Sequence, residues 1–351
     1  MSRIIHQSRL AAAVFFALTS QAAMAREADN KDQEPERYPQ MTVSGAVEVE
    51  AYHASPYTAG DKSDIVLAIG TLGLEAAIND WLSAEISTLY EENDTPLEID
   101  TASVMLGAED SLWSLRAGQF YVPFGVYETA MVSDPLTLEL GETRETAISA
   151  GIGLRGFSAE VYAFNGDLED ENQVNGFGAT AGLIGSIAAA DLALSAGYMN
   201  SLGESDGFEE AVKANTGGAD TDEIGAWTAS ATLGIDEMLL VGEYLTASDS
   251  FHASELAFDG GGAQPIAWNV EASYGFDLMG RPARAGIGYQ GTDEALALEL
   301  PESRVIAALS VEIFPHTALS FEYALDEDYS VADGGTGESA DTFTTQLAVA
   351  F

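Results

Sequence analysis

The sequence contains no cysteine and little positive charge. Without cysteine, the chain can form neither a disulfide framework nor a thiolate metal site. Its 13 lysine and arginine residues are outnumbered by 57 aspartate and glutamate residues. Because phosphate binding needs basic patches, and this acidic field repels phosphate, we expect no nucleic-acid partner. The acidity itself fits either solubility in a salty environment or attraction of cations, and composition alone leaves both open.

Long hydrophobic runs are absent as well. The apolar stretch Leu10–Leu18 has nine residues, and no later segment approaches 18, so a helical membrane protein is excluded by length. Arg3 and Arg9 precede this stretch and Ala23-Met24-Ala25 follows it, which is the order of a secretory signal peptide. We therefore predict a signal peptide over residues 1–25. Its removal leaves 11 basic and 57 acidic residues, a net charge of 11 − 57 = −46.

Period-2 alternation dominates the chain after a polar segment, residues 26–40, which we expect to be a short flexible periplasmic lead. In Ile266–Asp277, "IAWNVEASYGFD", large apolar and aromatic residues alternate with small and polar ones. Tilted strands that cross a membrane need about 9–11 residues. About sixteen segments of suitable length follow one another: 41–54, 64–79, 81–91, 99–109, 112–121, 146–157, 158–166, 175–188, 191–201, 224–235, 237–248, 265–277, 282–292, 303–314, 317–326 and 341–351.

The connections between these segments alternate in length. Short links follow the even-numbered segments: Asn79-Asp80, Glu109-Asp110-Ser111, Ala189-Ala190, Asp236-Glu237 and Pro315-His316. Longer links follow odd-numbered segments, as at 92–98, 202–223, 249–264 and 327–341. A soluble sheet protein also shows period-2 alternation, but it has no reason to alternate loop length. The pattern predicts an all-β fold over residues 41–351: a transmembrane antiparallel β-barrel of about 16 strands in the bacterial outer membrane, with short periplasmic turns and long external loops.

The last predicted strand ends on Phe351, with Phe343, Leu347 and Val349 on the same face. A terminal aromatic residue on an amphipathic final strand is similar to the assembly signal of bacterial outer-membrane proteins. We therefore expect the barrel-assembly machinery to be a partner through Phe351, with outer-membrane lipid and lipopolysaccharide around the barrel.

Motifs for catalysis or cofactor binding are weak. Gly151–Gly156, "GIGLRG", matches G-x-G-x-x-G, but dinucleotide binding needs a helix after the motif, and here another strand follows. The four histidines are scattered, and no G-x-S-x-G segment is present. We expect neither an enzyme nor a cofactor.

Charge on the inward strand faces is the more informative signal. Three bases are expected to face the lumen: Arg116, Arg155 and Arg284. Nine acids are expected there: Glu48, Glu50, Glu75, Glu85, Glu160, Glu243, Glu271, Glu312 and Glu322. Such a surplus in a narrow aqueous channel concentrates cations and repels anions. A wide pore with a merely polar lining and weak selectivity is the alternative.

One long link, residues 122–145, abandons alternation and is a candidate constriction loop. Four residues that bend or end backbone elements are expected to shape it: Pro123, Gly125, Pro135 and Gly141. The pore and constriction candidates are charged: Glu128, Asp134, Glu139, Glu142, Arg144 and Glu145 in the loop, with Arg116 and Arg155 across from it or beside it. The alternative is an outward loop that binds divalent ions and lipopolysaccharide.

The segment Ala117–Ala147, "AGQFYVPFGVYETAMVSDPLTLELGETRETA", resembles the signature of the LbtU-type siderophore porins. The resemblance implies an outer-membrane porin for passive uptake of an iron–siderophore complex, without a plug domain. The general alternative is a cation-selective diffusion porin for small cationic solutes, and a third is an outer-membrane enzyme or adhesin on the same barrel. By analogy with other sixteen-strand porins, a homotrimer is one assembly that this chain could form.

Overall fold

The computed structural model describes residues 38–108, 111–166, 168, 173–217 and 223–351. The predicted signal peptide, residues 1–25, and most of the predicted lead, residues 26–40, lie outside the described residues, as do Glu109 and Asp110 of one predicted turn. The described chain begins its first strand at Gln40, one residue before the predicted start of the barrel.

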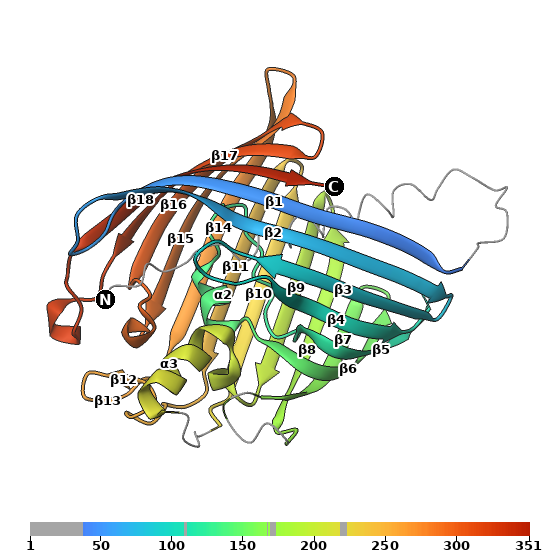
Figure 1. Ribbon diagram of the computed structural model, residues 1–351, viewed down its shortest axis with the longest axis horizontal. Helices are drawn as coiled ribbons and strands as arrows, with labels where there is room; N and C mark the ends of the chain where they lie inside the picture. Colours follow the sequence, from blue (N-terminus) through green and yellow to red (C-terminus); the bar gives the residue numbers. More distant parts are fainter. Residues whose placement is uncertain (1–37, 109–110, 167, 169–172, 218–222) are drawn as a thin grey trace.

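Sixteen antiparallel strands form a closed barrel, which confirms the predicted fold (Figure 1). In barrel order they are β1 (Gln40–Ser55), β2 (Lys62–Asn79), β3 (Leu82–Tyr90), β4 (Glu98–Leu106), β5 (Trp113–Tyr121), β6 (Arg144–Leu154), β7 (Phe157–Asn165), β8 (Gly176–Ile187), β9 (Ala190–Met199), β10 (Ala226–Ile235), β11 (Met238–Ala247), β14 (Ile266–Leu278), β15 (Arg281–Asp293), β16 (Ser303–Phe314), β17 (Thr317–Glu327) and β18 (Ser339–Ala350). Pairing of β1 with β18 closes the barrel, so no strand edge is left open.

The outer wall of the barrel is apolar. In β14, Val270 and Tyr274 are exposed on the outside, whereas Asn269 and Glu271 point inward and are buried. Aromatic rings gather on the outside near the strand ends, where Trp268 of β14 packs against Tyr289 of β15 at 4.8 Å between ring centroids. An apolar wall with aromatic residues toward its edges matches a bilayer and its interfaces. The protein is therefore a barrel of the bacterial outer membrane, as the sequence predicts.

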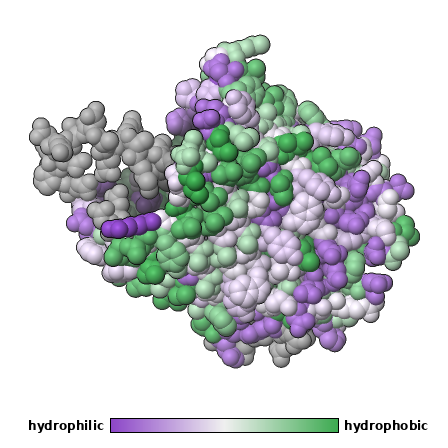
Figure 2. Space-filling model, turned by 180° about the vertical axis from the view of Figure 1, so that it is seen from behind, coloured by the Kyte–Doolittle hydropathy of each residue, from purple (hydrophilic) through white to green (hydrophobic). Residues whose placement is uncertain are grey.

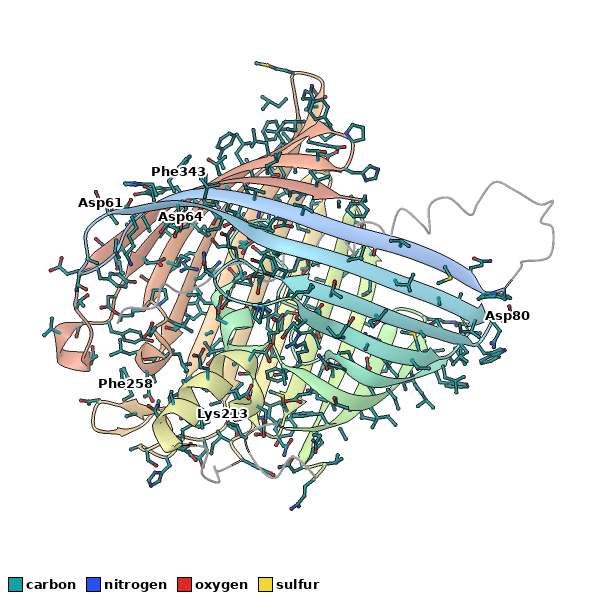
Figure 3. All side chains as sticks on the ribbon, viewed as in Figure 1. Asp61, Asp64, Asp80, Lys213, Phe258 and Phe343 are labelled. Carbon is teal, nitrogen blue, oxygen red and sulfur yellow. The ribbon has the colours of Figure 1, made fainter. Side chains whose placement is uncertain are left out.

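The two ends of the barrel differ. Figure 3 places Asp80, in a short turn, at one end, and Lys213 and Phe258, in long loops, at the other. Hydrophilic residues gather at the long-loop end in Figure 2, toward the lower right, while apolar residues cover much of the wall. By the usual orientation of such barrels, the short turns are periplasmic and the long loops external.

The external loops carry the remaining elements. These are α2 (Leu136–Gly141), η2 (Leu202–Glu204), α3 (Asp206–Thr216), β12 (Ala257–Phe258), β13 (Gly261–Gly262), η3 (Leu296–Leu298) and η4 (Val331–Asp333). None of the helices in the described ranges is long and apolar enough to cross a membrane. Figure 1 shows α2 enclosed by the strands, with α3 beside it at the long-loop end. The sequence pattern of alternating strands did not anticipate these short helices.

Apolar residues of the external loops form a core with the inner faces of the strands. Loop residues such as Phe124, Leu140 and Phe208 pack there with strand residues such as Phe164 and Leu245, all of them at most 1% exposed. The external loops are therefore packed against this part of the inner wall. This core positions the candidate site.

Candidate functional site

Loop 3, residues 122–143, connects β5 to β6 and runs along the inner wall of the barrel. Backbone N–H groups of the loop donate hydrogen bonds to three glutamates on three different strands: Glu243 on β11, Glu271 on β14 and Glu322 on β17. All three are buried, with 5%, 2% and 2% of their surface exposed. We call these three residues the acidic latch.

The acidic latch binds loop 3 at intervals of three residues. Glu243 accepts hydrogen bonds from the backbone N–H groups of Val126, at 2.8 Å, and Tyr127, at 3.0 Å. Glu271 accepts one from the N–H of Ala130 at 2.9 Å and one from the Thr129 hydroxyl at 2.7 Å.

Glu322 holds the tip of the loop in the same way. It accepts hydrogen bonds from the N–H of Val132 and from the N–H of Ser133, the latter at 3.1 Å to Oε1, and also from the Ser133 hydroxyl. On the return path, Thr137 donates its hydroxyl to Glu243 at 2.9 Å. Leu136 donates its N–H to Gln290 of β15 at 3.1 Å.

Carboxylates suit this task for a physical reason. A loop without regular structure carries backbone N–H groups that need acceptors once they are buried. An ionised carboxylate offers only acceptors, and its hydrogen bonds are stronger than those between neutral groups. The acidic latch therefore fixes loop 3 inside the barrel.

The other side of loop 3 is apolar. Phe124, Tyr127 and Leu138 join the core described above. Burial, together with Glu243 and Glu142 nearby, raises the pKa of the Tyr127 hydroxyl well above its usual range. The Tyr127 hydroxyl is therefore uncharged at physiological pH, and an uncharged side chain fits this largely apolar core.

The loop backbone approaches the wall closely at Gly197 of β9. A Cβ atom on Gly197 would lie 2.3 Å from the carbonyl oxygen of Phe124, far inside contact distance. Only glycine lets the loop backbone lie directly on this strand.

Replacing Gly197 by alanine should therefore displace loop 3 and destabilise the barrel by about 1–3 kcal/mol, the usual cost of overpacking. The measurement is the midpoint of urea unfolding in detergent micelles. Gly153→Ala is the matched control, because a Cβ atom on this glycine of β6 meets nothing within 4 Å. Equal midpoints for the two variants would contradict the close approach.

A second external loop, called loop 5 and described over residues 200–217 and 223–225, contacts loop 3 through Ser205, Asp206 and Gly207. The Ser205 hydroxyl donates to the carbonyl of Leu140 at 3.0 Å, and the N–H of Asp206 donates to the carbonyl of Glu142 at 2.9 Å. A Cβ atom on Gly207 would lie 2.0 Å from the carbonyl oxygen of Glu139, so the start of α3 touches α2. Loop 5 therefore holds the returning part of loop 3 from the external side.

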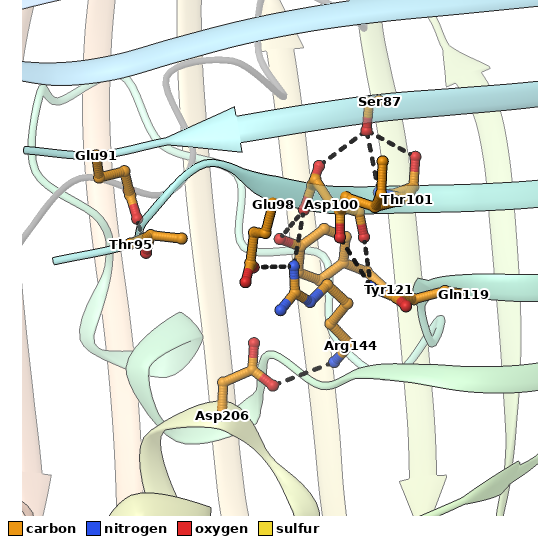
Figure 4. A network of polar contacts seen from close by, with 11 residues as sticks. Ser87, Glu91, Thr95, Glu98, Asp100, Thr101, Gln119, Tyr121, Arg144 and Asp206 are labelled. Carbon is orange, nitrogen blue, oxygen red and sulfur yellow. Dashed lines mark hydrogen bonds and ion pairs between the residues drawn. The ribbon is translucent and has the colours of Figure 1, made fainter.

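An ion-pair network at the external rim anchors the end of loop 3 (Figure 4). The Arg144 guanidinium donates to Glu98 at 2.6 Å and lies 3.6 Å from Asp100. The Tyr121 hydroxyl donates to Asp100 at 2.8 Å, and the N–H of Arg144 donates to Asp206 at 3.2 Å. The strand ends of β4, β5 and β6 are thereby tied to α3.

The predicted acids of the loop differ in exposure. Glu128 is partly exposed and accepts a hydrogen bond from the Thr232 hydroxyl of β10 at 2.8 Å. Glu139 is partly exposed too, whereas Asp134, Glu142 and Glu145 are buried. The structure thus gathers the predicted acids in and beside loop 3, but only two of them keep appreciable exposure.

The predicted loop-shaping residues occupy bends of loop 3. Pro135 stands immediately before α2, and Gly141 is the last residue of this helix. Gly125 and Gly141 both lie against the Tyr127 side chain, since a Cβ atom would come 2.2 Å from its ring at Gly125 and 2.2 Å from its hydroxyl oxygen at Gly141. Pro123 is partly buried at the start of the loop.

Two predicted bases do not face the loop acids as expected. Arg116 of β5 forms an ion pair with Glu85 of β3, donates to Ser103 of β4 at 2.9 Å and lies over the Phe120 ring at 4.3 Å. The prediction that Arg155 faces the lumen from a strand is wrong. Arg155 lies exposed in the periplasmic turn between β6 and β7.

The error at Arg155 has a backbone cause. The predicted strand 146–157 was too long, because Arg155 and Gly156 both have positive φ, 47° and 85°, and make a two-residue turn. The "GIGLRG" segment is therefore the end of a strand and a hairpin turn. No helix follows it, so the dinucleotide motif lacks its structural context.

Arg304 of β16 was missed. It is 1% exposed and binds Asp326 of β17 in a bidentate manner, with distances of 2.7 and 2.9 Å. The charges of Glu139 and Glu322 also act on it. Arg304 and Glu312 are separated by an even number of residues, so period-2 alternation puts both on the inward face of β16. The sequence pattern could therefore have identified Arg304 as an inward residue.

The described residues contain no group of three or more histidines, aspartates or glutamates arranged to hold a metal ion. What they do contain is a closed sixteen-strand barrel with an apolar outer wall and a long loop bound to its inner wall. These features define the class: an outer-membrane β-barrel of porin architecture.

Solved structures share this architecture. An anion-selective porin from Comamonas acidovorans superimposes with a TM-score of 0.64 at 13% sequence identity, covering 89% of this chain and 100% of that one. The outer-membrane channel DcaP of Acinetobacter baumannii gives a TM-score of 0.61 at 14% identity, covering 89% and 97%. OprB of Pseudomonas putida gives 0.62 at 10% identity, covering 89% and 94%. At such low identity, the likeness concerns the fold alone.

Sequence comparison identifies the family. A UPF0422 protein of Legionella pneumophila (strain Lens) is 31% identical over 360 residues, which cover 89% of this chain and 67% of that protein. A UPF0422 protein of Coxiella burnetii (strain RSA 493 / Nine Mile phase I) is 27% identical over 310 residues, covering 83% and 65%. The chain belongs to the UPF0422 family. No family model matches the chain, and the resemblance to LbtU-type siderophore porins is not confirmed by these comparisons.

Proposed function

We propose that this protein is a passive diffusion porin with a preference for cations. The observation that carries the proposal is loop 3, which is bound inside the barrel by the acidic latch. A loop fixed in this way inside the barrel would narrow the lumen and keep its own position during permeation. Solutes would cross this narrowed lumen by diffusion.

The charge of the wall supports the preference for cations. Glu75, Glu85 and Glu160 lie on the inward faces of β2, β3 and β7 and are at least partly exposed. Two bases stand against them: Arg116 of β5, which pairs with Glu85, and the exposed Arg284 of β15, which donates to the neutral Ser273 at 3.0 Å. A low-dielectric wall with an acidic surplus raises the local concentration of cations.

The finer candidate is passive uptake of an iron–siderophore complex. Its support is the resemblance of Ala117–Ala147, because this segment contains loop 3 itself. A segment that narrows the passage is where a solute-specific motif would act. Siderophore uptake is therefore the second function that we propose.

Planar-bilayer recording of the purified protein tests both functions. A diffusion porin gives steady single-channel currents, and a reversal potential of cationic sign in a KCl gradient supports the cation preference. Concentration-dependent block of this current by a ferric siderophore, with the iron-free siderophore as control, would support siderophore uptake. Protein that inserts without any conductance would overturn the porin proposal.

A homotrimer is part of the proposal. Among the structural relatives, OmpT of Vibrio cholerae is described in a trimer form, with a TM-score of 0.55 at 11% identity.

Phe351 lies where the barrel closes, and it exchanges backbone hydrogen bonds with Gly45 of β1 at 2.9 and 3.0 Å. Its recognition by the assembly machinery, and contacts with lipopolysaccharide, remain predictions from the sequence.

A further inference from the structure

The acids on the inner wall fall into two groups that the sequence does not separate. The acidic latch residues are at most 5% exposed, and their oxygens already accept hydrogen bonds from loop 3. Glu48 and Glu50 of β1 are also buried and both accept from Gln346 of β18. A hydrated cation cannot touch these carboxylates without displacing protein groups.

The second group lies on β2 and β3. Glu75 is exposed, and Glu85 keeps 34% of its side chain accessible. The two are direct partners in the β2–β3 register, so their side chains stand next to each other on the inward face. Two like charges at this spacing are unfavourable by themselves and favour a nearby cation.

Arg116 of β5 completes this arrangement. Its guanidinium forms an ion pair with Glu85, and its remaining contacts, the Ser103 hydroxyl and the Phe120 ring, hold it in place. Some 27% of its side chain stays accessible. The formal charge of the three side chains together is −1, because one base stands against two acids.

We propose that Glu75, Glu85 and Arg116, here called the charged row, determine which sign of ion this barrel passes. The inference rests on the proposed function, because selectivity has meaning only for a conducting pore. It assigns selectivity to the wall, not to the loop acids. Of those, Asp134, Glu142 and Glu145 are buried, so permeating ions do not reach them.

The remaining loop acids have protein partners. Glu128 accepts from Thr232, and the charge of Glu139 acts on Arg304. Glu75, by contrast, is exposed and lies on β2, a strand that none of the loop 3 hydrogen bonds described above reaches. The charged row is therefore an accessible acidic part of the inner wall, away from the hydrogen bonds that hold loop 3.

The size of the effect follows from simple electrostatics. A monovalent cation about 4 Å from one carboxylate in a water-like medium gains about 1 kcal/mol, or about a fivefold change in relative occupancy. Neutralising Glu75 should thus reduce the potassium-to-chloride permeability ratio by about fivefold or less, given screening by salt.

The experiment measures reversal potentials in a KCl gradient for the full-length mature protein in planar bilayers. Four variants change the charge of the row in steps: Arg116→Gln, Glu75→Gln, Glu75→Gln combined with Glu85→Gln, and Glu75→Lys. The expected order of cation preference is Arg116→Gln above the unchanged protein, then Glu75→Gln, then the double variant and Glu75→Lys. Asp249→Asn, which removes an exposed acid of an external loop, should leave the ratio unchanged.

Glu75 carries the decisive test, because it is exposed and its replacement leaves the Glu85–Arg116 pair intact. If both Glu75→Gln and Glu75→Lys conduct normally with an unchanged permeability ratio, the charged row does not determine selectivity. That result would leave the porin proposal intact. A complete lack of conductance in the unchanged protein would overturn both.

Discussion

Replacing Glu243, Glu271 and Glu322 together by glutamine is expected to release loop 3 and turn a steady pore into a fluctuating one. Each glutamine keeps one acceptor but presents an NH2 group to donors of the loop, where the carboxylate accepted two or more hydrogen bonds. A hydrogen bond to a charged acceptor contributes roughly 1.5–3 kcal/mol. Single-channel records should show frequent changes of current level and a higher mean conductance.

The same triple variant should unfold at lower urea concentration in detergent micelles. Glu312→Gln is the matched control, since this glutamate of β16 is exposed and makes none of the latch contacts described. Steady currents and an unchanged unfolding midpoint in the triple variant would show that the apolar contacts of loop 3 suffice to hold it. Single replacements should give smaller effects, which need not add, because the three residues bind one segment.

Replacing Arg304 by methionine is expected to be the most destabilising single change. The variant leaves Asp326 without its bidentate partner in a region that also contains Glu139 and Glu322. Removing one partner of a buried ion pair costs about 3–5 kcal/mol. Because Asp326 keeps 19% of its side chain accessible, the expected loss lies toward the lower end of this range. The free energy of unfolding, from urea titrations in micelles, measures this cost.

A double-mutant cycle tests the cause. Combining Arg304→Met with Asp326→Leu should recover a large part of the lost stability, since an apolar pair can replace a buried ion pair of similar volume. Arg281→Met is the control, because Arg281 is exposed at a periplasmic turn. A double variant no more stable than Arg304→Met would mean that packing, and not the ion pair, accounts for the loss.

The architecture could be predicted because its signals are local. Alternation in Ile266–Asp277 specifies which side chains face lipid, since a strand turns successive residues to opposite faces. Alternating loop lengths then specify the two ends of the barrel. The predicted sixteen segments lie close to the observed strands, and the error at Arg155 came from a two-residue turn that was taken as part of a strand.

The site was less predictable because its contacts join distant segments. Val126 binds Glu243 across 117 residues, Thr129 binds Glu271 across 142, and Val132 binds Glu322 across 190. Period-2 reasoning put these three glutamates on the inward face but had no means of recognising their partners. They were therefore predicted as free lumen charge, whereas the structure uses them to hold loop 3.

The amino-acid sequence by itself thus determined a sixteen-strand outer-membrane barrel with an acidic inner face, because strand periodicity and loop length are properties of neighbouring residues. The tertiary structure alone decided which acids bind protein and which stay accessible. Closure of the barrel brings β11, β14 and β17 against loop 3, whereas Glu75 stays exposed and Glu85 stays partly accessible on β2 and β3. Carboxylates of one chemical type acquire different roles because hydrogen bonding and exposure depend on what the fold places beside them.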